Sequence, residues 1–99
     1  MKHLKLYEDS NILYSNMMKN TYWVYKSYVG DDIIMKILIT DDTGKGYEIL
    51  NQKTQNFINL YYSRKHFMTF YCDDRMIRKA TQKEIEDFEM NKQTNKYNL

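Results

Sequence analysis

The stretch from residue 21 to residue 80 has the pattern of short β-strands separated by turns. Apolar and aromatic side chains recur in it at a period of two, which is typical of strands. Acidic residues and glycine interrupt the runs at Gly30–Asp32, Asp41–Gly44 and Asp73–Asp74, and these residue types favour tight turns. Because short turns join antiparallel neighbours, the pattern restricts the chain to a mainly β fold built on one antiparallel meander.

Five or six strands are expected in this stretch. They are Tyr22–Val29, Ile33–Ile39, Tyr47–Leu50, Phe57–Tyr62, Phe67–Cys72 and Arg75–Ala80, with a hairpin turn that includes Gly44–Gly46 and a basic turn at Ser63–His66. Ile33–Ile39 has apolar residues on both faces, which predicts a central strand covered on both sides. So many short antiparallel strands favour a small barrel or a bent sheet, SH3-like or OB-like, since closure removes exposed edges.

A helix after the last strand has the clearest start signal in the chain. Thr81 and Glu84 have the spacing of a capping box, in which each side chain bonds the backbone amide of the other residue. Ile85 and Phe88, one turn apart, would dock this helix against an open end of the barrel. The helix is expected over residues 81–90. Residues 91–99 have no periodicity, so a frayed tail is expected there.

The first 20 residues carry weaker patterns. His3–Tyr7 alternates and would form a short opening strand. Asp9–Asn11 supplies capping side chains for a short helix that would run to about Lys19. No repeat or linker divides residues 1–99, so the sequence predicts a single α+β domain in which strands dominate.

The composition is that of a folded, weakly basic domain. The hydrophobic fraction of 42% and the ten Tyr, four Phe and one Trp are more than a disordered chain carries. The net charge of +2 is far from that of a protein that coats DNA. Cys72 is the single cysteine, which excludes an internal disulfide or a Cys-based zinc cluster and fits a small buried side chain. The N-terminal residues lack the apolar core of a signal peptide, and no apolar run approaches the ~20 residues that span a bilayer. A soluble cytoplasmic protein is therefore expected, with no membrane partner.

Acidic pairs and one Ser–His pair are the residues that invite a catalytic or metal interpretation. The acidic pairs are Asp31 and Asp32, Asp41 and Asp42, and Asp73 and Asp74. All three fall at expected turns, where Asp bonds nearby backbone amides, and Asp41–Gly46 lacks the ligand spacing of a calcium loop. Ser63 and His66 are three residues apart with no acidic partner indicated by the sequence. No catalytic residue, metal or cofactor is therefore expected.

A basic and aromatic cluster is the candidate nucleic-acid site. It comprises Tyr61, Tyr62, Arg64, Lys65, Arg75, Arg78 and Lys79. Lys and Arg would contact phosphates, while exposed aromatic rings, Trp23 included, would stack on bases. Together with His66, the same cluster would suit metal-independent RNA cleavage, a remote alternative. A purely structural interpretation is also open, in which the aromatic residues fill the core and the Lys and Arg side chains make a turn soluble.

A second candidate surface lies on the first expected strand. Trp23, Tyr25 and Tyr28 give this strand aromatic side chains on both faces, so one face would remain exposed. Exposed Tyr and Trp are frequent anchors of protein interfaces. This surface predicts a protein inhibitor that docks on an enzyme or on a nucleic-acid-processing complex of a host cell.

The segment Met76–Phe88 resembles the C-terminal part of small β-rich accessory proteins of tailed bacteriophages, in which a last strand passes through an Ala-Thr step into a short acidic helix. The resemblance covers about a seventh of the chain and transfers no functional residue. It implies a protein of the host cytoplasm that binds nucleic acid or a host protein without chemistry of its own. The sequence thus predicts a non-enzymatic binding module, with nucleic acid as the first partner class and a host protein as the second.

Overall fold

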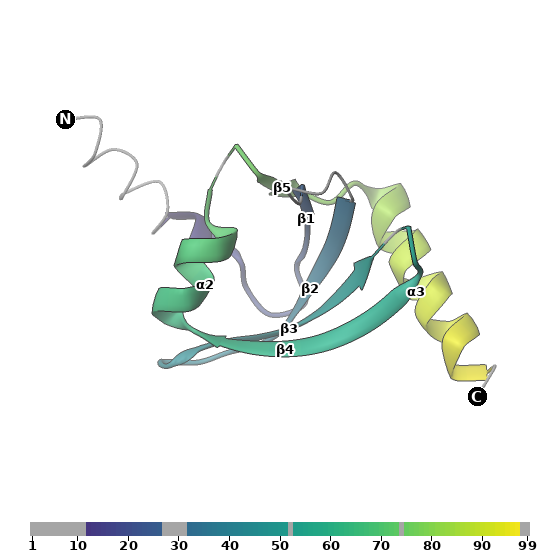
Figure 1. Ribbon diagram of the computed structural model, residues 1–99, viewed down its shortest axis with the longest axis horizontal. Coiled ribbons are helices and arrows are strands. Elements are labelled where there is room, and N and C mark those ends of the chain that lie inside the picture. Colours follow the sequence, from purple (N-terminus) through teal and green to yellow (C-terminus); the bar gives the residue numbers. More distant parts are fainter. Residues whose placement is uncertain (1–11, 27–31, 52, 74, 98–99) are drawn as a thin grey trace.

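The computed structural model describes residues 12–26, 32–51, 53–73 and 75–97 (Figure 1). A short helical segment over residues 12–16 precedes the sheet, which confirms the short N-terminal helix. The expected strand at His3–Tyr7 lies outside the described residues. The further elements are β1 (Tyr22–Lys26), β2 (Asp32–Thr40), β3 (Gly44–Asn51), β4 (Asn56–Ser63), α2 (Arg64–Tyr71), β5 (Ile77–Lys79) and α3 (Gln82–Tyr97).

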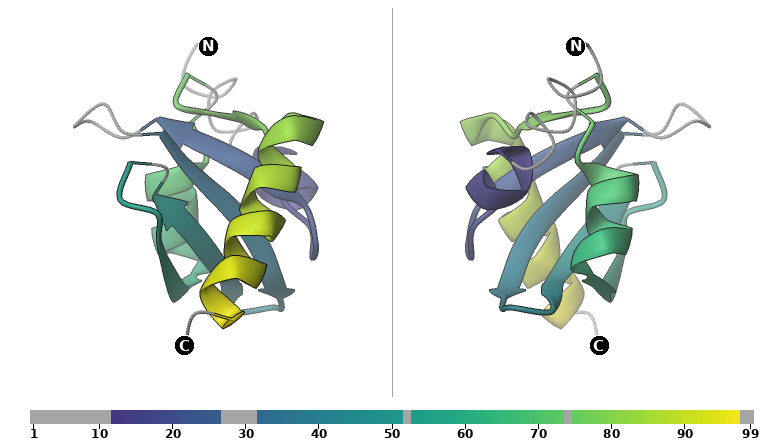
Figure 2. Two further views of the ribbon diagram at one scale, coloured as in Figure 1. Left: turned by 90° about the vertical axis from the view of Figure 1, so that its right-hand side faces the viewer. Right: turned by 90° about the vertical axis from the view of Figure 1, so that its left-hand side faces the viewer.

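The five strands form one antiparallel sheet in the order β4-β3-β2-β1-β5. The first four strands make the expected meander, and the chain then crosses through α2 to place β5 beside β1. β4 and β5 are therefore the two edges of an open sheet. The prediction of a bent antiparallel sheet is confirmed, and its barrel alternative is wrong. In place of barrel closure, helices cover the sheet, with α3 on one face and α2 and residues 12–16 on the other (Figure 2).

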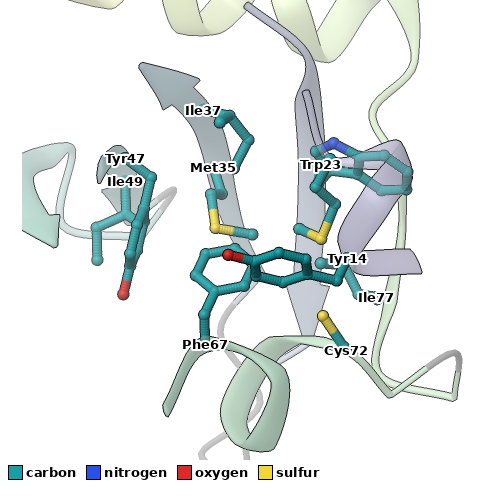
Figure 3. Close-up of a cluster of buried hydrophobic side chains, with 10 residues drawn as sticks. Tyr14, Trp23, Met35, Ile37, Tyr47, Ile49, Phe67, Cys72 and Ile77 are labelled. Carbon is teal, nitrogen blue, oxygen red and sulfur yellow. The ribbon is translucent and has the colours of Figure 1, made fainter. Parts of the chain in front are cut away.

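Each face of the sheet has its own apolar core. The first core lies under α2 and residues 12–16 and is drawn in Figure 3. Its buried members are Tyr14, Met17, Trp23, Met35, Ile37, Tyr47, Ile49, Phe67, Cys72 and Ile77. The second core lies under α3 and consists of Val24, Ile34, Leu50 and Phe88. Because Ile34 joins the second core while Met35 and Ile37 join the first, the prediction that β2 is covered on both sides is confirmed.

The helix α2 replaces the strand that was expected at Phe67–Cys72, so that prediction is wrong. The basic turn expected before it is also wrong, because Ser63 caps the helix and its hydroxyl oxygen accepts a hydrogen bond from the His66 amide at 3.4 Å. Phe67 and Tyr71, one turn apart, pack against each other with ring centroids 5.2 Å apart. Both also meet the ring of Tyr47 on β3 at 5.3 Å. Helical spacing therefore places both rings on the first core.

The start of α3 has the capping box that the sequence predicts. The Glu84 amide donates to the Thr81 hydroxyl at 3.2 Å, and the Thr81 amide donates to the Glu84 carboxylate at 2.9 Å. Phe88 is fully buried and Ile85 is half-buried, so α3 docks on a face of the sheet and not on the end of a barrel. The helix runs on to Tyr97, so the expected end at residue 90 is wrong.

A row of polar contacts holds the second half of α3 on the sheet. Glu89 accepts hydrogen bonds from Lys36, at 2.9 Å, and from the hydroxyl of Tyr22. One turn further along the helix, Lys92 forms an ion pair with Glu48, which is buried on β3. These contacts keep α3 helical beyond the residues whose apolar spacing is visible in the sequence.

The remaining strand boundaries differ from the predictions by a few residues. β3 begins at Gly44, so Gly44–Gly46 is strand and the turn before it is shorter than expected. Asp41 makes that turn, as predicted, and its Oδ1 accepts from the amides of Thr43 and Gly44 at 2.9 and 3.0 Å. β5 keeps only Ile77–Lys79 of the predicted run. In the described part of the chain, no helix has the length and apolar character needed to cross a membrane.

We predict that Gly44→Ala destabilises the fold by about 2 kcal/mol or more, because the added Cβ would lie 2.1 Å from the Tyr62 carbonyl oxygen on the paired strand. Gly46→Ala is the matched control, since the atoms nearest to its Cβ would belong to the Ile39 and Tyr61 side chains, at 3.4 Å, which is ordinary van der Waals contact. We expect it to change the free energy of unfolding by no more than about 0.5 kcal/mol. Urea denaturation measures both values, and equal losses for the two variants would contradict the close β3–β4 approach at Gly44.

Candidate functional site

The predicted nucleic-acid residues lie at two opposite edges of the sheet. Tyr61, Tyr62, Arg64 and Lys65 belong to β4 and the first turn of α2. Arg75, Arg78 and Lys79 belong to β5 and the turn before it. Because three strands separate β4 from β5, the structure does not gather these residues into one rim.

Two of the three cations near β5 have acidic partners. The Arg78 guanidinium forms a bidentate salt bridge with the Glu84 carboxylate, with N–O distances of 2.8 and 2.9 Å. This contact holds the pKa of Glu84 at about 2, well below its usual value. Arg75 contacts both carboxylate oxygens of Asp73 at 3.1 and 3.0 Å. The charge available to phosphates at this edge is correspondingly reduced.

The predicted aromatic protein interface on β1 is not exposed as expected. Trp23 is only 3% exposed and lies in the first core, so the prediction that it faces a partner or stacks on bases is wrong. Tyr25 is half-buried on the same face, with its ring centroid 5.1 Å from that of Tyr71 on α2. Tyr28 lies outside the described residues. The reason for the error is that this face of β1 is covered: Trp23 lies in the first core, which also includes Tyr14 and Met17, and Tyr25 packs against Tyr71 of α2.

β4 is the longer of the two edge strands of the sheet. β4 is eight residues long, and its register with β3 runs without interruption from Ser63 to Asn56. Its sequence contains neither a charged residue nor proline. Figure 1 shows β4 along the outside of the molecule, and among the described residues only β3 pairs with it. Charges, proline and bulges are the usual protection of an edge strand against pairing with another chain. β4 lacks all three.

Exposed apolar side chains surround this edge. Four large apolar or aromatic residues are between 48 and 53% exposed: Ile39, Ile58, Tyr61 and Phe70. Ile58 and Phe70 lie on the α2 side of the sheet. Ile39 and Tyr61 lie on the opposite face, which α3 covers in part. Gly46 on β3 stands between them, and the two side chains line a shallow groove of about 370 Å³. We call these four side chains and the outer backbone of β4 the β4 edge surface.

Hydrogen bonds hold the Tyr61 ring in place on this surface. Its hydroxyl donates to Oδ1 of Asp41 at 2.8 Å and also contacts the hydroxyl of Thr43. The Thr43 hydroxyl donates to the same carboxylate oxygen at 2.7 Å. These hydrogen bonds lower the pKa of Asp41 to about 2, and the bond from the Thr43 hydroxyl has the largest effect. The Asp41 carboxylate is therefore ionised at neutral pH. Tyr61 is therefore a positioned aromatic ring with one exposed side, which is the usual form of an interface anchor.

The C-terminal end of β4 is basic. Arg64, Lys65 and His66 are exposed in the first turn of α2, which contains no acidic residue. We call these three residues the basic end of β4. Within the described residues, no carboxylate forms an ion pair with Arg64 or Lys65. The Arg64 guanidinium lies over the ring of Tyr14, 5.1 Å from its centroid.

A buried lysine lies beneath this basic end. Lys45 is only 2% exposed, and its ammonium lies 4.3 Å from the centroid of the Tyr14 ring that Arg64 also contacts. It donates to the Thr40 hydroxyl at 2.8 Å, and burial lowers its pKa. Two cations thus share one aromatic ring near the C-terminal end of β4.

The described residues give little support for catalysis. Ser63 Oγ lies 3.2 Å from His66 Nδ1, but this contact belongs to the helix cap, and within the described residues no carboxylate orients the imidazole. Among these residues, no group of three or more His, Cys, Asp or Glu side chains is arranged to hold a metal ion. Comparison of the chain with protein-family models, with curated proteins and with solved structures gives no match.

The sequence interpretation found Tyr61, Arg64 and Lys65 but missed the edge itself. The signal was present, because no charged residue occurs between Asn56 and Ser63. An uncharged strand can be central or at an edge, however, and only the strand order decides between the two.

We predict that Glu84→Gln lowers the free energy of unfolding by about 1–2 kcal/mol at neutral pH, because Glu84 both caps α3 and pairs with Arg78. Since the folded-state pKa of Glu84 is depressed from 4.5 to about 2, its ionised form stabilises the fold above about pH 4.5. This contribution is lost as the pH falls from about 4.5 to 2.

The difference between the wild type and Glu84→Gln should therefore shrink over that range in denaturant titrations. Glu86→Gln, which removes an exposed carboxylate of the same helix, serves as the control. A difference that stays constant down to pH ~2 would contradict the role of the Arg78 contact.

Proposed function

We propose that this protein is a non-enzymatic binding module that docks on another protein through the β4 edge surface. The observation that carries this proposal is the open, uncharged, eight-residue edge of β4, flanked by four exposed apolar or aromatic side chains. An incoming strand gains affinity from main-chain hydrogen bonds to such an edge and specificity from its alternating side chains.

The β4 edge surface combines two kinds of contact that stable interfaces use. Ile39, Ile58 and Phe70 offer apolar area for removal from water, at roughly 25 cal/mol per Å². Tyr61 adds a ring whose hydroxyl bonds are already made, so that little rotamer freedom is lost on binding. Both features favour a protein ligand.

The protein class that we propose is a phage-type accessory protein acting in the host cytoplasm, by inhibiting or redirecting a host enzyme or nucleic-acid-processing complex. The resemblance of Met76–Phe88 to phage accessory proteins supports this class. That segment forms β5 and the start of α3, away from β4, so it gives no information about the binding surface. The partner surface now proposed replaces the one centred on Trp23.

Nucleic acid remains a second candidate partner. The specific observation in its favour is that Arg64 and Lys65 lie three and four residues after Tyr61, whose ring is exposed. This arrangement provides two phosphate contacts and one stacking platform. These two cations are fewer than the five that occur in residues 59–80, so nucleic-acid binding by this surface would be weak.

We predict that the tagged protein retains one or a few specific proteins from a bacterial lysate after nuclease treatment and that Ile58→Lys abolishes this retention. A lysine at this position places a charge on the exposed edge and is a natural means of blocking strand addition. Met90→Lys is the matched control, because Met90 is also an exposed apolar residue but lies on α3. Equal retention by both variants would remove the β4 edge surface as the binding site.

We predict that any binding of single-stranded DNA or RNA depends on salt with a log–log slope of about −1.4, as expected for two phosphate contacts on a single strand. Fluorescence anisotropy of a labelled oligonucleotide between ~50 and 200 mM salt measures this slope. A slope near −3.5 would instead require all five predicted cations and would contradict the separation of the two edges. No binding at ~50 mM salt would eliminate the nucleic-acid candidate.

A further inference from the structure

We infer that the ligand of β4 is an extended segment of another protein whose N-terminal residues are acidic and whose following residues are apolar at alternating positions. This inference rests on the proposed function and adds the direction and the chemistry of the ligand. Three observations support it: the regular pairing of β4, the side chains on the two faces of β4, and the charge at the C-terminal end of β4.

The regularity of β4 sets the length and the direction of the ligand. The pairing of β4 with β3 is continuous over eight residues, so the outer side of β4 offers an uninterrupted ladder. Every pair in the sheet is antiparallel, and antiparallel pairing is slightly more stable per residue than parallel pairing. An added antiparallel strand would begin beside Ser63 and end beside Asn56.

The two faces of β4 select different side chains of the ligand. On the α2 side, the added strand would lie beside Ile58, Leu60 and Tyr62, with Phe70 of α2 next to them. This row is apolar and partly exposed, so every second ligand residue should be apolar. On the α3 side the row includes Asn59 and Tyr61, which tolerates polar side chains such as Thr.

The basic end of β4 selects acidic residues at the start of the ligand. The N-terminal end of an antiparallel strand would lie next to Arg64, Lys65 and His66, which are exposed. The Asp41 carboxylate at this end of the sheet already accepts hydrogen bonds from Thr43, Gly44 and Tyr61. Within the described residues, no ion pair joins Asp41 or the exposed Asp42 beside it to Arg64 or Lys65, so a ligand carboxylate would complement these two cations.

The same charge argument disfavours a second copy of this chain as the occupant. Two antiparallel β4 strands would bring each basic end towards the residues that precede the other β4, and these include Lys53. From Ile49 to Cys72 the sequence contains no Asp or Glu, so a second copy offers no carboxylate at that position. Like charges across an interface oppose association, so an acidic partner fits better than self-pairing.

Blocked seven-residue peptides test this inference directly. The acid-first peptide, acetyl-Glu-Asp-Val-Thr-Val-Thr-Val-amide, has the proposed order, and its exact reverse, the acid-last peptide, has the same composition. We expect the acid-first peptide to bind about tenfold more tightly in fluorescence anisotropy, which corresponds to about 1.4 kcal/mol. It should also slow hydrogen exchange of β4 amides, and N-methylation of the peptide amides that face β4 should abolish binding.

A charge-reversal variant shows whether the basic end determines this preference. Arg64→Glu combined with Lys65→Glu should lose the acid-first preference and gain a similar preference for a Lys-Arg-first peptide. The matched control is Lys19→Glu combined with Lys83→Glu, which reverses two exposed charges on residues outside β4 and α2 and should leave the preference unchanged. Circular dichroism and urea denaturation verify that both double variants fold.

Three results would overturn the inference. The first is equal affinity for the acid-first and acid-last peptides. The second is peptide binding that does not slow hydrogen exchange of the β4 amides. The third is a dimer, detected by light scattering, in which hydrogen exchange of the β4 amides is slow without any peptide. Displacement of the peptide by an oligonucleotide at equal concentration would indicate nucleic acid as the natural occupant and would also overturn it.

If the partner captured from a lysate protects β4 and depends on Ile58 but neither peptide binds, this inference fails while the proposed function stands. If that partner neither protects β4 nor depends on Ile58, both fail.

Discussion

The structure depends on covering β3 on both of its faces. Every residue from Gly44 to Leu50 is buried, although this strand contains a lysine and a glutamate. A single sheet of five strands can bury an inner strand in this way only if something packs on each face. α2 and residues 12–16 do so on one side and α3 does so on the other, so the helices complete the cores that a closed barrel would otherwise have provided.

The two charged residues of β3 show how this burial is achieved. Glu48 faces α3 and pairs with Lys92, in the same region where Lys36 and Tyr22 bond to Glu89. These contacts are the physical reason why α3 extends past residue 90. Lys45 faces the other side, where the Tyr14 ring and the Thr40 hydroxyl replace part of its hydration. Its lowered pKa is the mark of an incomplete replacement.

The sequence predicts the features that local chemistry decides and fails where tertiary contacts decide. The meander, the turn at Asp41 and the capping box of Thr81 and Glu84 follow from periodicity and short-range hydrogen bonds, and all three are confirmed. Phe67–Tyr71 fits either period, because apolar residues there occupy adjacent positions, and the Ser63 cap is what favours the helix. The prediction for Trp23 is wrong because tertiary contacts decide its burial: it lies in the first core together with Tyr14, Met17 and Phe67. The predicted site joined residues of β4 to residues of β5, because distance along the chain does not reveal strand order.

The two edges of the sheet differ in a way that bears on function. β5 pairs over only three residues, two of which are charged, and Arg78 is fixed to the start of α3 by Glu84. Such an edge is short and protected. β4 is eight residues long and uncharged, with apolar side chains exposed on both sides of it. An unprotected edge exposes the protein to unwanted pairing, and its presence beside a protected edge of the same sheet is the reason why we propose β4 as the binding site. The helices that bury β3 cover the faces of the sheet and leave β4 as the place where a further strand continues the same antiparallel order.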